Sequence, residues 1–278
     1  MDARFGGRSA GIRARSGVGR PDAREFDLVN PPVPCRVLPH MIGLGASNMA
    51  LDHALLDAVD ADPREAVFRT YEWAEPTLSL GYFQHIADAR SQQRWNDVPI
   101  VRRPSGGGAL WHDHELTYMI VMPRSHSLAV RPSALYRAIH AAIVDLLRTD
   151  EIAAARRGEE RPGEGARPFL CFLDRDPEDV LVGGAKIVGS AQRRRPGAVL
   201  QHGSFLLRGS DATPELPGLS DLAPSRIGRG DWPARLGMAL PRALGLAPYP
   251  GEVSGCEGAR AESLAVEVYR PAAWTNKR

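Results

Sequence analysis

The stretch VRRPSGGGALWHDHELTYMIVMP, residues 101–123, contains three consecutive glycines between two runs of strand-forming residues. Glycine adopts positive φ angles without strain and leaves its backbone N–H groups unshielded, so a loop of this kind can approach a ligand closely. The spacing matches neither the GxGxxG dinucleotide motif nor the GxxxxGK[ST] phosphate loop. The stretch therefore predicts either a ligand-binding loop or a plain glycine-rich turn between two strands.

Strand-forming and helix-forming segments lie on both sides of this stretch. Apolar residues recur at helical spacing between positions 49 and 59, behind a possible cap at Ser47, and a second helix is predicted from Pro132. The predicted strands lie in AVFRTYEW (66–73), TLSLGYF (77–83), PIVRRPS (99–105), ELTYMIVMP (115–123), PFLCFL (168–173), DVLVGGAKIVGSAQRR (179–194) and AVLQHGSFLL (198–207). Because groups of strands are separated by single helices, the sequence predicts an α+β fold with a mixed, mainly antiparallel sheet flanked by helices.

Composition sets the domain organisation. Residues 1–34 are rich in Arg, Gly and Pro and predict a disordered tail, with a transit peptide as the alternative. The charged segment 150–167 predicts a mobile surface excursion. Residues 35–278 are long enough for one core, so we expect a single folded domain there.

Charge and cysteine content exclude several classes of protein. The formal net charge of +2 gives no argument for binding nucleic acid or an anionic membrane, and no run of eighteen apolar residues predicts a membrane-spanning helix. The three cysteines are far apart with no CxxC pair, which excludes a disulfide framework and a thiolate zinc cluster. We therefore expect a cytoplasmic protein. On a strand, His112 and His114 would share a face, but no carboxylate or thiolate spacing completes a metal site.

Lysine is almost absent from the chain. Of 35 basic residues only Lys186 and Lys277 are lysines, so arginine supplies nearly all the positive charge. Arginine cannot replace lysine where a compact ammonium is needed, which makes Lys186 a candidate functional residue, with a solvent-facing strand residue as the alternative. Cys171 lies in an apolar run and is either an inert core residue or, next to a cation, an acyl acceptor.

Five segments in this order resemble the lipoate branch of the biotin/lipoate protein ligase superfamily, which holds lipoate–protein ligases and octanoyltransferases. The segments are NMALDHALL (48–56), EPTLSLGYFQ (75–84), VRRPSGGGALWHDHELTY (101–118), GGAKIVGSAQRR (183–194) and LQHGSFLL (200–207). A CF pair shortly before the lysine segment is most similar to the LipM-type octanoyltransferases. The GGG sequence of the loop departs from many octanoyltransferases, whose third residue is bulkier, and is similar to the ligases.

The resemblance implies that residues 35–278 form a single catalytic domain that closes with short helices. It also implies a cysteine acyltransferase in which Cys171 carries the acyl chain and Lys186 holds the carbonyl oxygen. The expected acyl donor is octanoyl-acyl carrier protein. The expected acceptor is a lysine of a lipoyl-domain protein, such as glycine-cleavage H protein or a 2-oxoacid dehydrogenase E2. No cofactor is expected. The residues expected to bind substrate are Arg102, Arg103, Ser105, Gly106, Gly107, Gly108, His112, Gly189, Ser190, Gln192, His202 and Gly203.

Two other functions stay open from the sequence. An ATP-dependent lipoate–protein ligase would use ATP and Mg²⁺, hold an acyl-adenylate on its arginines and glycines, and leave Cys171 merely packed. A non-catalytic protein that binds lipoyl domains would dock normally and turn over no donor. The incoming amine must also lose a proton, and the sequence does not choose between His112 and His202 as the group that assists.

Overall fold

The computed structural model describes residues 1, 32–158, 167–174, 176–226 and 231–278. Most of the predicted tail, and the centre of the predicted excursion at 150–167, lie outside these residues. The first strand, β1 (Pro34–Val37), pairs with two neighbours.

The main sheet of the described residues has the strand order β12-β1-β3-β7-β11-β10-β9-β8, and β2 also pairs with β3. The strands are β1, β2 (Met41–Gly43), β3 (Ala66–Trp73), β7 (Glu115–Pro123), β8 (Ala154–Arg156), β9 (Val180–Val182), β10 (Ala185–Arg194), β11 (Ala198–Leu206) and β12 (Ala247–Pro250). Pairing is antiparallel from β3 through β7, β11, β10 and β9 to β8, and parallel among β1, β2, β3 and β12. The predicted mixed, mainly antiparallel sheet is confirmed.

A smaller sheet carries the glycine-rich stretch. It has the order β5 (Ile100–Arg102), β4 (Thr77–Leu80) and β6 (Leu110–His112). The three glycines form the loop between β5 and β6, so they connect two strands that both pair with β4. The sequence did not predict a strand at 110–112, because three residues are too few for a period-2 pattern to stand out.

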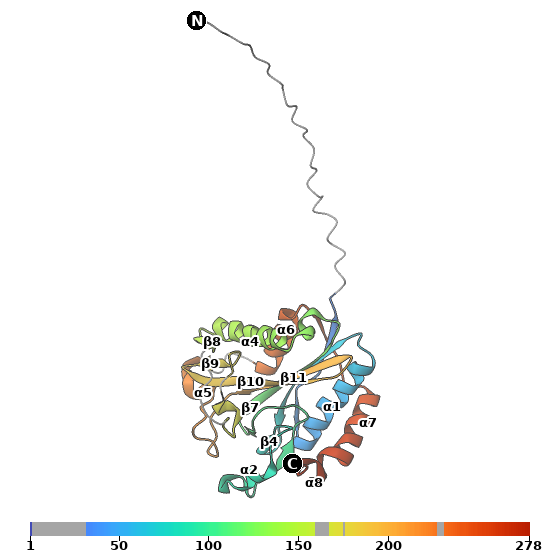
Figure 1. Cartoon of the computed structure of the whole chain (residues 1–278), viewed down its shortest axis with the longest axis vertical. Coiled ribbons are helices and arrows are strands. Elements are labelled where there is room, and N and C mark those ends of the chain that lie inside the picture. The colour runs from blue at the N-terminus through green and yellow to red at the C-terminus, as the bar shows by residue number, and fades with distance from the viewer. Residues whose placement is uncertain (2–31, 159–166, 175, 227–230) are drawn as a thin grey trace. The chain divides into compact units, whose positions relative to one another are not determined.

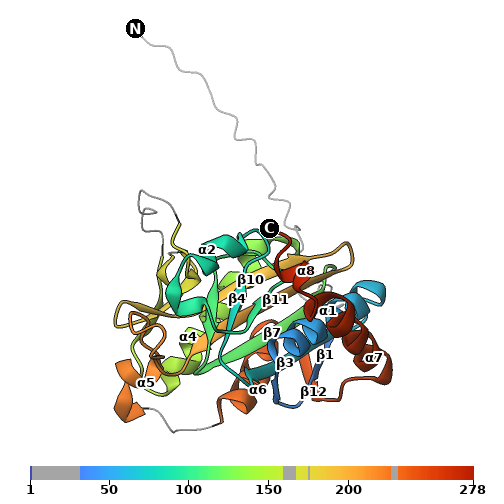
Figure 2. The ribbon, with the colours of Figure 1, turned by 90° about the horizontal axis from the view of Figure 1, so that it is seen from below.

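Helices cover both faces of the main sheet (Figure 1, Figure 2). Alternate residues of β7 point to opposite faces: Tyr118 and Ile120 belong to one apolar cluster, and Met119 and Val121 to another. Residues of α4 (Pro132–Thr149) and α6 (Trp232–Ala243) complete the first cluster, while α1 (Gly45–Ala61) and α7 (Gly255–Leu264) contribute to the second.

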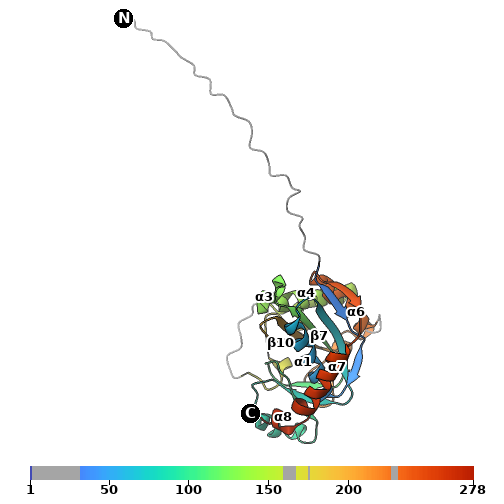
Figure 3. The ribbon, with the colours of Figure 1, turned by 90° about the vertical axis from the view of Figure 1, so that its right-hand side faces the viewer.

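Near the C-terminus, α7 and the helical turn that follows it pack along α1 (Figure 3). After α7 come a π-helical turn, Ala265–Tyr269, and α8 (Ala272–Thr275). The remaining short helices are α2 (Ile86–Arg90), α3 (Ser127–Val130) and α5 (Leu219–Leu222), with 3-10 turns at Gln93–Trp95, Cys171–Leu173 and Pro224–Arg226. Within the described residues, no helix is both long and apolar enough to cross a membrane.

Two local predictions are wrong. Helix α1 begins at Gly45 after Leu44, so Ser47 lies inside the first turn and does not cap it. Gly45 allows this earlier start, because a Cβ there would lie 2.9 Å from the Trp73 ring. The run PFLCFL at 168–173 is not a strand: it makes one bridge, Leu170 to Ala109, and then turns into the 3-10 helix.

Candidate active site

Cys171 and Lys186 meet at the junction of two elements. Cys171 opens the 3-10 turn, and its backbone N–H donates to the carbonyl of Ala109, just after the glycine loop, at 2.8 Å. Lys186 lies on β10 beside a register shift between residues 186 and 188. Its Nζ lies 2.9 Å from the Cys171 carbonyl oxygen and 3.9 Å from Sγ. The structure thus brings together the two residues that were expected to carry the chemistry.

Asp179 holds the Lys186 ammonium in place. Its Oδ1 lies 3.0 Å from Nζ, and both side chains are almost fully buried. Burial lowers the pKa of Lys186, but electrostatic interactions with Cys171 and Asp179 outweigh it and hold that pKa above its ordinary value. Lys186 is therefore an ammonium at neutral pH. The sequence analysis missed Asp179, because nothing in its local pattern shows that it faces a lysine across a hairpin.

The glycine loop packs directly against the cysteine. A Cβ on Gly108 would lie 3.0 Å from the Cys171 nitrogen, and Gly107 adopts φ +94°, which favours glycine. Arg103 fixes the loop, since its guanidinium donates to the carbonyls of Gly106 and Gly108 at 3.1 and 2.8 Å. Within the described residues, the amide N–H groups of the three glycines donate to no other group. They remain available to an oxygen in the adjoining cavity.

Arg102 does not reach the site. Its buried guanidinium donates to backbone carbonyls of the segment 81–84 and to Thr275 of α8. These bonds join the small sheet to the C-terminal helix. The two neighbouring arginines that the sequence treated alike have different roles, because side chains alternate across a strand.

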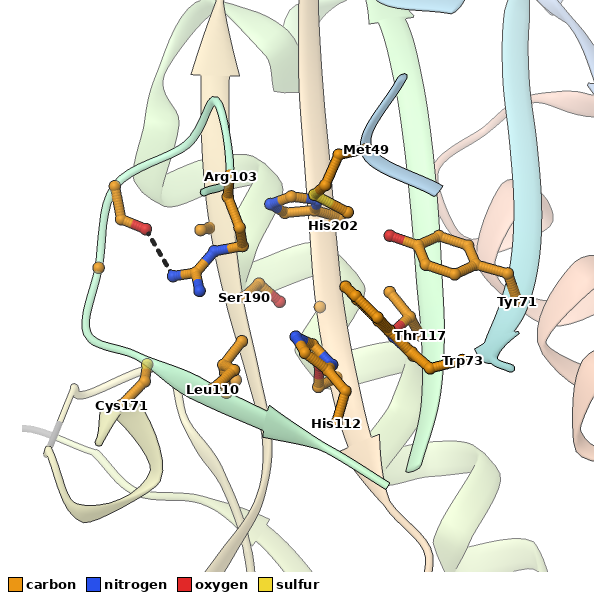
Figure 4. A pocket seen from close by; sticks show the side chains of 16 residues that line it. Met49, Tyr71, Trp73, Arg103, Leu110, His112, Thr117, Cys171, Ser190 and His202 are labelled. Atoms are coloured by element: carbon orange, nitrogen blue, oxygen red, sulfur yellow. Dashed lines mark hydrogen bonds between the residues drawn. The ribbon is translucent and has the colours of Figure 1, made fainter. Parts of the chain in front are cut away.

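Two cavities share Cys171 in their walls. One is mainly apolar and holds about 430 Å³ of space free of atoms, part of it open to solvent. In Figure 4 Cys171 lies at one end of this apolar cavity and Tyr71 at the other. Its further lining includes Met49, Trp73, Leu110, His112, Thr117 and His202. The second, polar cavity is lined by Lys186, Asp179, Tyr136, His140 and Gln192. Gly106, Gly107, Ser190 and Ala191 line both cavities.

The two predicted histidines line the apolar cavity but have both ring nitrogens occupied. His112 Nδ1 lies 2.5 Å from Glu115 Oε1, and its Nε2 lies 2.6 Å from Ser79 Oγ. Trp73 stacks on the His112 ring with 3.7 Å between centroids. Burial lowers the pKa of His112, which keeps its ring neutral. A carboxylate accepts only, so Nδ1 carries the proton and Nε2 accepts from the serine.

His202 repeats this arrangement. Its Nδ1 donates to Asp52 Oδ2 at 3.0 Å, and its Nε2 lies 2.5 Å from Ser105 Oγ. Asp52 is fully buried and also accepts from Arg69 and Tyr71. Ser105 therefore supports a histidine in the wall and lines neither cavity. Neither His112 nor His202 has a free nitrogen to take a proton from substrate.

The remaining predicted residues lie on β10 and β11 around the shared wall. A Cβ on Gly189 would lie 2.7 Å from Lys186 Cε, and one on Gly203 would lie 2.6 Å from Ser190 Oγ. Gln192 borders the polar cavity and donates to the Pro132 carbonyl at 3.0 Å. Within the described residues, no group of three or more His, Cys, Asp or Glu side chains is arranged to hold a metal ion.

Comparison with known proteins gives a consistent family. The lipoyl protein ligase A/B catalytic domain matches residues 45–214. The octanoyltransferase LipM of Moorella thermoacetica is 32% identical over 260 residues, which cover 84% of this chain and 94% of that protein. The octanoyltransferase LipM of Geobacillus kaustophilus is 39% identical over 171 residues, 58% of this chain. The match spans 61% of that relative's own length.

Solved structures share the fold at lower identity. A lipoate-protein ligase A bound with ATP superposes with a TM-score of 0.69 and 21% identity, over 87% of this chain and 98% of that one. Protein Ta0514 of T. acidophilum, solved with bound lipoic acid, gives a TM-score of 0.70 and 22% identity, over 88% of this chain and all of that one. At this identity, both likenesses show the fold alone.

Proposed function

The chain belongs to the lipoyl protein ligase A/B catalytic domain family, and we propose that within it the protein is an octanoyltransferase that works through a thioester on Cys171. The relatives of this chain named octanoyltransferase LipM support this choice. The observation that carries it is the position of Cys171, in the wall of an apolar cavity with the Lys186 ammonium 3.9 Å from its sulfur.

In the first half of the reaction, the Cys171 thiolate attacks the thioester carbonyl of octanoyl-acyl carrier protein. A C–S bond to the enzyme forms, the bond to the carrier breaks, and the carrier leaves as a thiolate. Lys186 offsets negative charge at the sulfur and on the carbonyl oxygen. The free amides of the glycine loop supply further donors, and losing one such donor costs about 3–4 kcal/mol in comparable sites.

The acyl chain occupies the apolar cavity, where each buried CH₂ contributes about 0.8 kcal/mol. In the second half, a lysine amine of a lipoyl-domain protein attacks the acyl-enzyme and takes the chain as an amide. Because a thioester is an activated donor, neither step uses ATP or a metal ion. Dividing the transfer into two steps lets two large carrier proteins use one site in turn.

The partners in this proposal are octanoyl-acyl carrier protein as donor and a lipoyl-domain protein, such as glycine-cleavage H protein or a 2-oxoacid dehydrogenase E2, as acceptor. We place the reaction in the cytoplasm. The three unpaired cysteines, Cys35, Cys171 and Cys256, are the form that a reducing compartment maintains.

Incubation of the protein with octanoyl-acyl carrier protein in the absence of ATP tests the proposal. Intact mass spectrometry should show one octanoyl adduct, and addition of a lipoyl-domain protein should move it to that protein. An enzyme that forms no adduct, and modifies the acceptor only with free octanoate and ATP, would instead be a ligase. Docking without any transfer would indicate a binding protein.

A further inference from the structure

Three serine hydroxyls hydrogen bond to histidine rings within the described residues, and only one of the three serines lines a cavity together with Cys171. Ser79 and Ser105, the partners of His112 and His202, are buried and line neither cavity. Ser190 is partly exposed and lines both cavities together with Cys171. Its partner is His140, on α4, outside the five segments that carry the family resemblance.

The proton positions in this third pair follow from its contacts. His140 Nδ1 lies 2.5 Å from the backbone carbonyl of Glu178, which can only accept, so Nδ1 carries a proton. Burial lowers the pKa of His140 to about 4, so at neutral pH Nε2 is bare. Nε2 lies 2.5 Å from Ser190 Oγ and therefore accepts the serine proton.

Tyr118 completes the surroundings of Ser190. Its hydroxyl lies 2.5 Å from Ser190 Oγ, and since the serine proton points to His140, Tyr118 is the donor. Burial raises the pKa of Tyr118, which keeps that phenol protonated. Ser190 Oγ thus donates once and accepts once, and its second lone pair accepts from no group of the described residues.

The second half of the reaction needs a proton acceptor at this place. Lys186 is held as an ammonium and has no lone pair, while the serines bonded to His112 and His202 line neither cavity. We propose that Ser190 and His140 relay the proton of the attacking amine: Ser190 Oγ accepts the N–H proton while its own proton passes to His140 Nε2. This inference rests on the octanoyltransferase function.

The bond changes balance without any further reactant. The uncharged amine forms a C–N bond to the acyl carbon, the C–S bond breaks, and its electron pair returns to Cys171 as a thiolate. The surplus proton of the nitrogen arrives at His140. The carboxylates of Glu178 and Asp176 offset the transient imidazolium, against the opposing charge of Lys186. His140 then releases the proton to water in the polar cavity that it lines.

Ser190→Ala and His140→Asn test the relay in the full-length protein. The Asn amide retains a donor for the Glu178 carbonyl but offers no Nε2. The two half-reactions are timed separately by quenched intact mass measurements: loading from octanoyl-acyl carrier protein, then transfer from preloaded enzyme to a lipoyl-domain protein. His126→Asn is the matched control, because His126 caps α3 through its ring and Asn is a good capping residue.

We expect both variants to load at rates within twofold of the wild type and to transfer about a hundredfold more slowly, the usual size of a lost acid–base group. The double variant should transfer no more slowly than the slower single variant, since both residues belong to one proton relay. Transfer within twofold of the wild type, or equal slowing of both half-reactions, would overturn the relay. Failure of the wild type to load would instead refute the octanoyltransferase function.

Discussion

The Lys186 ammonium contacts Cys171 at two atoms, the carbonyl oxygen at 2.9 Å and the sulfur at 3.9 Å. A single group thus fixes the backbone of the 3-10 turn and faces its side chain. Phe172 adds a third contact, with its ring centroid 5.3 Å from Nζ. The position of the nucleophile and its electrostatic surroundings therefore depend on the same lysine, which makes this contact the most informative one to perturb.

Cys171→Ser should abolish the octanoyl adduct while the protein stays folded, because a serine hydroxyl is far less ionised than a thiol at neutral pH. Intact mass and peptide mapping would measure this. Cys256→Ser is the control: Cys256 is exposed on α7, and its loss should leave loading unchanged. Burial raises the pKa of Cys35 to about 12, so Cys35 should carry no adduct either. Wild-type transfer by Cys171→Ser would exclude the thioester.

Lys186→Arg should slow loading by about a hundredfold or more with an unchanged circular dichroism spectrum. Arginine keeps the charge but is longer and planar, and a misplacement of about 1 Å can cost on the order of a hundredfold in rate. Lys277→Arg provides the comparison, since Lys277 packs between the rings of Tyr82 and Trp274, where arginine stacks equally well. Near wild-type loading by Lys186→Arg would show that the mechanism does not require a lysine at this position.

Gly189→Ala should displace the same ammonium without touching any charge. The added Cβ would lie 2.7 Å from Lys186 Cε and 3.1 Å from Nζ, so the lysine stem must move. We expect loading to fall at least tenfold while the melting temperature changes little. Gly255→Ala, which meets nothing within 4 Å, should load like the wild type. Equal loading by the two variants would show that the exact ammonium position is unimportant.

Arg102→Met should lower the stability of the fold and leave loading unchanged, whereas loss of a substrate-binding arginine would slow loading. The substitution leaves the carbonyls of Gln84 and Thr275 without their donor and removes one of two donors to the Gly81 carbonyl. We expect the free energy of unfolding to fall by about 3 kcal/mol, measured in urea, with loading per folded molecule retained. Arg64→Met, at a side chain 86% exposed, should leave the unfolding midpoint unchanged. If the Arg102→Met protein is stable but no longer loads, Arg102 binds substrate as the sequence predicted.

His140 should make the folded protein less stable in acid. Its pKa is about 4 in the folded protein and about 6.5 in an unfolded chain. As the pH falls, the unfolded state therefore binds the extra proton at a higher pH than the folded state does. Stability therefore rises with pH between about 4 and 6.5, by about 3 kcal/mol from this group. His140→Asn should flatten that part of the profile relative to the wild type, as measured by urea unfolding. Parallel profiles for both proteins would show that His140 is not held neutral.

Local patterns predicted most of the elements. AVFRTYEW and ELTYMIVMP became β3 and β7 with the predicted bounds, because continuous strand-forming runs between turn signals report local preference directly. The run at 168–173 failed because its conformation is set from outside: Ala109 anchors the backbone of Phe169 and Cys171, and the chain then turns. Local propensity contains no information about such a tertiary contact.

The sequence by itself determined the α+β fold, the glycine loop and the candidacy of Cys171 and Lys186, because glycine runs, residue periodicity and the scarcity of lysine are properties of the chain alone. Only the tertiary structure decided that Asp179 holds the lysine, that Arg102 is structural while Arg103 fixes the loop, and that His140 meets Ser190. These contacts join separate elements, and their geometry is set by sheet register and helix packing, which no single segment encodes.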